Sequence, residues 1–211
     1  NEAVESVLEE LIARQPDNQT AKLTLVQFAT GSRGAGAGEE ILQRFLGDAP
    51  DAHELRLLLA QVYQVTERQD EAVATYEQVI SRAGNEDPAL TAKTRLAAIE
   101  LAQGNTEVGE TLIEEVLAID SINTDALVLR GALNYDRDML KAAVSDLRSV
   151  LRQEPENQRA QLLLARTHNK AEDYVLAKDA YRRAIQMEPD NAQSTLELVA
   201  LLVRERELDE A

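Results

Sequence analysis

The sequence predicts an all-α protein, a solenoid of stacked, antiparallel helix pairs. Three observations predict it: a repeat of 34 residues, apolar residues at helical spacing within each repeat, and no stretch with the alternating pattern of a strand. The prolines mark the repeat, because Pro16 and Pro50 lie 34 residues apart, and so do Pro155 and Pro189.

A small residue recurs once per repeat and marks the second helix of each pair. The spacing is 34 residues except at one junction, which carries three extra residues, and the series is Gly38, Ala72, Gly109, Ala143, Ala177 and Ala211. Where the repeat continues, a bulky apolar residue follows four positions later and further apolar residues follow at seven and eight. This spacing places them on one face of an amphipathic helix.

A first helix precedes this one in each repeat and carries an apolar residue followed by a small one. Leu59-Ala60 and Leu164-Ala165 are examples, and Arg130-Gly131 holds the same place with a weaker first member. Each repeat is therefore predicted to contain two helices of about a dozen residues. Small residues lie where the two helices must approach closely.

Two stretches depart from this regular pattern. Residues 31–38 are rich in Gly and lack the Lys-Ser/Thr ending of a phosphate-binding loop. We interpret them as a flexible or loosely helical turn, and we expect the next helix to begin late because each Gly costs about 1 kcal/mol in a helix. Asp87-Pro88 is typical of an N-cap followed by proline at the first helical position, which would lengthen that helix by about a turn.

These features together resemble the tetratricopeptide repeat family. The closest stretch to the family's pattern contains Leu164-Ala165, Tyr174, Ala177, Tyr181, Ala184 and Pro189. The resemblance implies a right-handed superhelix over the whole chain. It divides the chain into a partial repeat at 1–18, complete repeats at 19–52, 53–89, 90–123, 124–157 and 158–191, and a partial repeat at 192–211, which we interpret as a single array.

The departures from the family are local. The Trp that is common in the first helix is missing, and the later Tyr position holds Glu100 in the repeat 90–123, so we expect weaker packing there. Both ends of the chain fall inside repeats. We therefore expect a fragment of a longer bacterial array, and end-to-end self-association of the incomplete end repeats is a further expectation.

Composition and charge exclude several classes of function. The formal net charge of −16 disfavours nucleic acid, and the absence of Cys excludes disulfides and thiolate metal sites. No apolar run is long enough for a membrane span. The only histidines, His53 and His168, lie three repeats apart, and we find no nucleophile, metal set or cofactor loop. We expect no enzymatic activity, no cofactor and no metal, and both the cytoplasm and the bacterial periplasm are compatible.

The resemblance implies that a partner binds on the concave side, which the first helices line. The family's ligand-facing positions carry over to Leu23, Gln27, Leu57, Gln61, Val128, Tyr135, Arg159, Leu162, Arg166, Asn169, Lys170 and Arg204. The carboxylate clamp of chaperone-binding members is absent, since the ninth position of the repeat is never Asn. The N-terminal part of this surface is apolar and lined by Gln and Thr, and it suits a helix or an extended segment with leucine-like anchors.

Four cations gather on the last third of this surface in a strongly acidic chain: Arg159, Arg166, Lys170 and Arg204. One interpretation is a patch that binds an acidic segment of a protein partner. The other is a set of solvated cations that pair with neighbouring carboxylates, and the sequence leaves both open.

The function that follows is a non-catalytic scaffold that binds a protein or peptide in the concave groove. One alternative is a periplasmic accessory protein of exopolysaccharide or cellulose export or of pilus assembly. Another is an RNA-binding helical repeat, which the negative charge disfavours.

Overall fold

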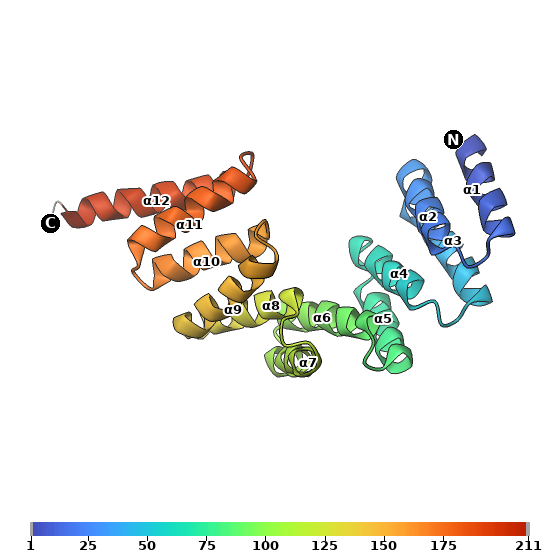
Figure 1. The fold of residues 1–211 in the computed structure, drawn as a ribbon, viewed down its shortest axis with the longest axis horizontal. Coiled ribbons are helices and arrows are strands. Elements are labelled where there is room, and N and C mark those ends of the chain that lie inside the picture. The colour runs from blue at the N-terminus through green and yellow to red at the C-terminus, as the bar shows by residue number, and fades with distance from the viewer. Residues whose placement is uncertain (1, 210–211) are drawn as a thin grey trace. The chain divides into compact units, whose positions relative to one another are not determined.

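The computed structural model describes residues 2–209, with side chains for residues 3–205, and this part of the chain is helical throughout, without strands (Figure 1). The twelve helices are α1 Glu2–Arg14, α2 Gln19–Arg33, α3 Ala35–Asp48, α4 His53–Val65, α5 Gln69–Ala83, α6 Asp87–Ala102, α7 Thr106–Ile119, α8 Thr124–Asp136, α9 Leu140–Gln153, α10 Gln158–Lys170, α11 Tyr174–Met187 and α12 Ala192–Asp209. The predicted fold class, an all-α solenoid of helical repeats, is confirmed. None of the described helices combines the length and apolar character that a membrane crossing requires.

The chain divides into two compact units between Gln103 and Gly104. The first unit holds α1 to α6 and the second holds α7 to α12, and within each unit every helix packs on the next one in the chain. The boundary falls inside the predicted repeat 90–123, where the sequence leads us to expect the weakest packing. The assignment of one continuous array with these repeat boundaries stays a prediction.

Asparagines begin three of the first helices. The side-chain oxygens of Asn18, Asn123 and Asn157 accept a hydrogen bond from the backbone N–H three residues later, at 2.9, 3.1 and 2.9 Å. These bonds satisfy N–H groups that have no partner within the helix. The caps recur at the repeat spacing, which fixes where α2, α8 and α10 begin.

The core of each helix pair forms where small residues allow close approach. Ala72, Ala143 and Ala177 are fully buried, as the repeat pattern predicts, and Ala211 lies outside the described residues. A Cβ atom built on Gly131 would lie 3.2 Å from the Leu147 side chain. The small residues therefore let α8 lie close to α9, and large apolar residues such as Leu147 fill the seam.

The expected late start of the second helix in repeat 19–52 is wrong. The turn is reduced to Gly34, whose φ is 92°, and α3 begins directly afterwards at Ala35. A Cβ on Gly38 would lie 2.0 Å from Thr30 Oγ1, so any larger residue there would force the Thr30 side chain to move where α3 approaches α2. Packing between the two helices outweighs the helix propensity that glycine lacks.

The other two expectations about helix ends have mixed outcomes. The extra residues do lengthen α6, which begins at Asp87 and has 16 residues, although the N-cap is Glu86 and not Asp87. At the other end, α12 continues to Asp209 without the expected turn and second helix. The left-handed turn position would fall on Arg206, between Glu205 and Glu207, and all three are good helix formers.

Buried polar residues occupy some packing positions of the first helices. Asn134 donates to Asp146 Oδ2 at 3.1 Å, and Arg130 donates to both Asp146 oxygens at 3.0 and 2.8 Å. Asp146 itself is buried. The hydrogen bond to Asp146 is the main reason that the pKa of Arg130 is raised. The carboxylate therefore serves two donors and joins α8 to α9.

His168 holds a comparable packing position in α10 without such a partner. The residue is 4% exposed, and Nδ1 makes no hydrogen bond within the described structure. Asp173 Oδ2 lies 3.6 Å away, beyond hydrogen-bond distance. Burial lowers the pKa of His168, the charge of Arg148 adds to this, and Asp173 opposes it.

We expect Asp146→Ala to destabilise the second unit by about 2 kcal/mol, because it leaves the Asn134 donor unpaired and removes two hydrogen bonds of Arg130, which keeps its ion pair with Glu114 at 3.5 Å. Urea unfolding followed by amide hydrogen exchange measures this, with the first unit as an internal reference. Asp179→Ala is the control, since its ion pair with Arg183 is exposed. Equal destabilisation by the two changes would contradict the assigned role.

Glu172 has a φ of 61°, the left-handed conformation that Gly104 supplies at an equivalent turn with a φ of 85°. We expect Glu172→Gly to stabilise the second unit by about 0.5–1 kcal/mol, because it removes the Cβ strain of that conformation. Glu172→Ala keeps the Cβ atom and should give no such gain. The midpoint of urea unfolding compares the three proteins.

The lowered pKa of His168 makes stability depend on pH. Because the unfolded chain takes up the proton first as pH falls below about 6.5, stability is full above this pH and is lost below it. We expect His168→Tyr, which copies Tyr63 of an earlier repeat, to reduce the loss between about pH 7.5 and pH 5.5. Urea unfolding at both pH values tests this, and an unchanged pH dependence would refute it.

Candidate functional site

A hollow on the first-helix side of the second unit brings together five of the residues predicted to face a partner. It has a volume of about 430 Å³ and is lined by Tyr135, Arg166, Asn169, Lys170, Tyr181, Glu197, Ala200 and Arg204. The first helices α8, α10 and α12 supply all of these except Tyr181, which comes from α11. The repeat spacing brings equivalent positions of successive first helices side by side.

An ion pair occupies the floor of the hollow. Arg166 binds both oxygens of Glu197, at 2.6 Å from Nη2 to Oε1 and 2.9 Å from Nε to Oε2. Tyr181 donates to Glu197 at 3.1 Å, and Gln193 donates at 2.7 Å. The positive charge of Arg166 is therefore matched inside the protein, as the solvated-cation interpretation expects.

The protonation states follow from this arrangement. Burial alone raises the pKa of Glu197, but the hydrogen bonds from Arg166 and Gln193 outweigh it and bring the pKa below its ordinary value. Burial raises the pKa of Tyr181 to about 12, and the Glu197 charge adds to the effect. At neutral pH Glu197 is ionised, and Tyr181 remains a protonated donor.

Lys170 and Arg204 are paired less strongly with carboxylates than Arg166 is. Lys170 Nζ donates to the Tyr135 carbonyl at 2.8 Å, lies 4.7 Å from the centre of the Tyr135 ring, and is 3.3 Å from Asp138. The Asp138 side chain is 76% exposed, so this ion pair is weak. Arg204 donates to the neutral Asn169 side chain at 2.8 Å and lies over the Tyr174 ring. These two side chains therefore retain N–H groups that can donate hydrogen bonds to a ligand.

The remaining predicted residues lie elsewhere. Arg159 is exposed in the first turn of α10 and does not line the hollow, so the four predicted cations do not form one patch. Leu162 is half-buried. In the first unit, Leu23 is half-buried on α2, whereas Gln27 and Gln61 are exposed.

Leu57 and Val128 correct the sequence-based expectation, because they are only 9% and 6% exposed and offer little surface to a partner. First helices of successive repeats contact each other, α4 with α6 and α8 with α10. An apolar side chain gains free energy by lying within such a contact.

Sequence reasoning missed Glu197. Tyr181, which the repeat pattern places on the apolar face of its helix, is buried as expected, and it also lines the hollow. A usable signal existed, since Arg166 and Glu197 are oppositely charged and lie 31 residues apart, close to one repeat. The cross-repeat bonds of Lys170 and Arg204 each join residues 35 apart. Within the described residues, no group of three or more His, Asp or Glu side chains is arranged to hold a metal ion.

The comparisons with known proteins agree with this architecture. A family model for the tetratricopeptide repeat matches residues 31–88 and 135–192, together more than half of the chain. No curated protein matches the chain in sequence.

Three solved structures show the same fold at low identity. A chain of the APC/C hetero-tetramer Cut9–Hcn1 has a TM-score of 0.80 and 12% identity over 97% of this chain, which spans 40% of that chain. PilW, a type IV pilus biogenesis factor, has a TM-score of 0.73 and 17% identity over 92% of this chain and 90% of its own. YrrB, described as a TPR protein with an unusual peptide-binding site, has a TM-score of 0.57 and 17% identity over 90% and 96%. With its helix pairs, its 34-residue spacing and this family match, the chain belongs to the tetratricopeptide repeat family.

Proposed function

We propose that the chain is a non-catalytic scaffold that binds an acidic segment of a partner protein in the hollow between α8, α10 and α12. The fold of this family supports a general role in protein–protein interaction. The observation that carries the finer proposal is the pair Lys170 and Arg204, whose contacts are mainly with neutral groups. A carboxylate of the partner would receive charge-assisted hydrogen bonds from both.

The other residues of the hollow position these donors. The Tyr135 ring lies beneath the Lys170 ammonium, and Asn169 orients Arg204. Arg166 is held by Glu197, so it stabilises the floor and leaves ligand binding to its neighbours. Tyr181 is fixed as a donor to Glu197, and its pKa of about 12 keeps the hydroxyl protonated at neutral pH, so it is not available as a general base. These roles support binding without chemistry.

Two other functions have less support. A role in envelope assembly rests on the similarity to PilW, which extends over nearly all of both chains, and its 17% identity supports the fold alone. It is the second candidate. RNA binding has little support because Arg166 is internally paired and the two available cations are local to α10 and α12.

The test is a pull-down from a lysate of the source organism with three proteins. Lys170→Glu/Arg204→Glu should reduce capture of a partner by at least about tenfold, because two charge-assisted hydrogen bonds become repulsive contacts. Arg159→Glu/Arg182→Glu is the matched control, since it makes the same charge change at exposed cations outside the hollow.

Loss of the partner from the hollow variant alone would support the proposal. Equal losses from both variants would show a general charge effect, and full retention by the hollow variant would refute the assigned site. Both outcomes would move attention to Gln27 and Gln61 in the first unit.

A further inference from the structure

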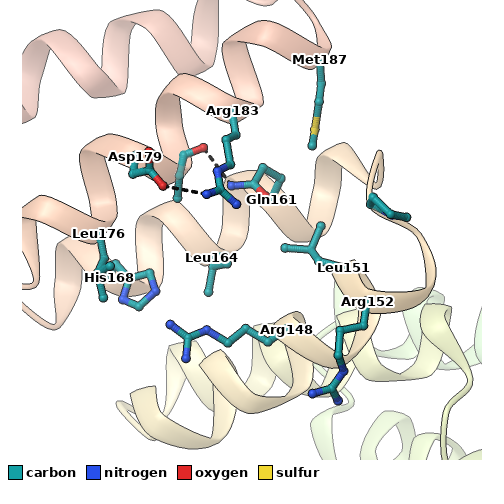
Figure 2. Close-up of a pocket in the computed structure, with 12 residues that line it drawn as sticks. Arg148, Leu151, Arg152, Gln161, Leu164, His168, Leu176, Asp179, Arg183 and Met187 are labelled. Atoms are coloured by element: carbon teal, nitrogen blue, oxygen red, sulfur yellow. Dashed lines mark hydrogen bonds and ion pairs between the residues drawn. The ribbon is translucent and has the colours of Figure 1, made fainter.

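A second concave surface lies on the other side of α10, between the second helices α9 and α11 (Figure 2). It has a volume of about 440 Å³, with Arg148 and Leu151 on the α9 side, Leu164 and His168 on the floor, and Leu176 and Arg183 on the α11 side. A neighbouring pocket is also lined by Arg148, His168 and Leu176 and continues toward Met139. We call the two together the α9–α11 groove.

The groove and the hollow use opposite faces of α10. Leu164 and His168 line the groove, whereas Arg166 and Lys170 line the hollow. Successive helical residues turn by about 100°, so positions two apart, such as 164 and 166 or 168 and 170, point about 200° apart. A ligand in the groove therefore does not compete for the side chains of the hollow.

The preceding repeat fills the equivalent space with a chain of ion pairs. Arg130 lies between two carboxylates, at 2.8 Å from Asp146 and 3.5 Å from Glu114. One repeat of 34 residues later, these three positions hold Arg148, Leu164 and Ala180. All three line the groove, so an acid–base–acid set is replaced by a cation, an apolar residue and a small residue.

This replacement places no acidic residue for Arg148 at any of the three positions. Arg148 is exposed and makes no hydrogen bond or ion pair with any residue that the structure describes. In Figure 2 its side chain extends from α9 toward His168. Across the groove, Arg183 has only an exposed ion pair with Asp179 at 3.0 Å. The groove is lined by the cations Arg148, Arg152, Arg183 and Lys141 and by the carboxylates Asp138, Asp173 and Asp179. Its lining therefore carries a small net positive charge in a chain with a net charge of −16.

Apolar surface accompanies the charge. Leu176 is 44% exposed, and Met139 at the far end is 52% exposed. A nucleic acid backbone would leave this apolar surface uncovered, whereas a peptide with both acidic and leucine-like side chains would match it. The 14 residues of α9 span about 21 Å, the length of roughly six extended residues.

We propose that the α9–α11 groove is a second docking site, which binds an acidic segment of a partner protein with a carboxylate against Arg148 and an apolar side chain against Leu176. The bound carboxylate supplies the acidic group that the preceding repeat provides internally to Arg130. The proposal does not depend on the function assigned to the hollow.

The full chain carries its own reporters for a test. His168 lines the groove, and His53, the only other histidine, lies in the first unit. The probe is a decapeptide of Glu and Leu, and its counterpart with Gln in place of Glu is the control. We expect saturable changes in the NMR ring resonances of His168, none in those of His53, and at least roughly tenfold weaker binding of the Gln peptide.

Four variants locate the site. Arg148→Gln should weaken binding by roughly tenfold, and Arg159→Gln, the same change at an exposed position outside the groove, should not. Arg148→Glu/Leu164→Arg/Ala180→Asp copies the residues of the preceding repeat, and it should abolish binding while circular dichroism shows an intact helical fold. Lys170→Glu/Arg204→Glu should leave the His168 response unchanged, which separates this site from the hollow.

Other outcomes overturn the proposal. The proposal is wrong if the His168 resonances do not respond to the peptide at millimolar concentration. It is also wrong if Arg148→Gln binds the peptide as tightly as the wild type does. A response lost only in Lys170→Glu/Arg204→Glu would assign the peptide to the hollow. Preferential binding of an oligouridylate would replace the peptide with RNA as the occupant.

Discussion

Close approach of two helices at a small residue is the constraint on which the rest of the structure depends. With no Cys in the sequence, the helix pairs are held together by packing. Gly38 and Gly131 lie where a Cβ atom would meet the facing helix, and Ala143 and Ala177 are fully buried. At such a site even one added methyl group lowers the stability of the packed helix pair, because protein interiors are close-packed. This seam determines how each second helix lies on its first.

A fixed seam turns the 34-residue repeat into a spatial register, and the register builds both candidate sites. Residues about one repeat apart become neighbours, as in the bonds from Lys170 to Tyr135 and from Arg204 to Asn169. A single substitution therefore changes a surface in a predictable place. The hollow is formed by this register on the first helices, and the α9–α11 groove opens where the register places Ala180 opposite Leu164.

The periodic part of the structure could be predicted from the sequence, and the non-periodic part could not. Small and apolar residues at fixed spacing predicted the helix pairs, and family positions predicted five residues of the hollow. The start of α3 was missed because close packing at Gly38 outweighs helix propensity. Glu197 was missed, and Leu57 was expected to be exposed, because pairing and burial depend on the neighbouring helix, which single-helix periodicity does not describe.

The polar residues in packing positions are paired differently in two successive repeats. Asn134 is satisfied because Asp146 faces it, and Asp146 in turn holds Arg130. In the next repeat His168 takes the place of Asn134 and Ala180 takes that of Asp146, and His168 Nδ1 has no hydrogen bond within the residues that the structure describes. A buried polar group without a hydrogen bond lowers the stability of the fold, so a sequence optimised for stability alone would not place a histidine here. A repeat that keeps the family's Leu164-Ala165 and Tyr181 packing tolerates that cost, because these residues are buried and supply its apolar seam.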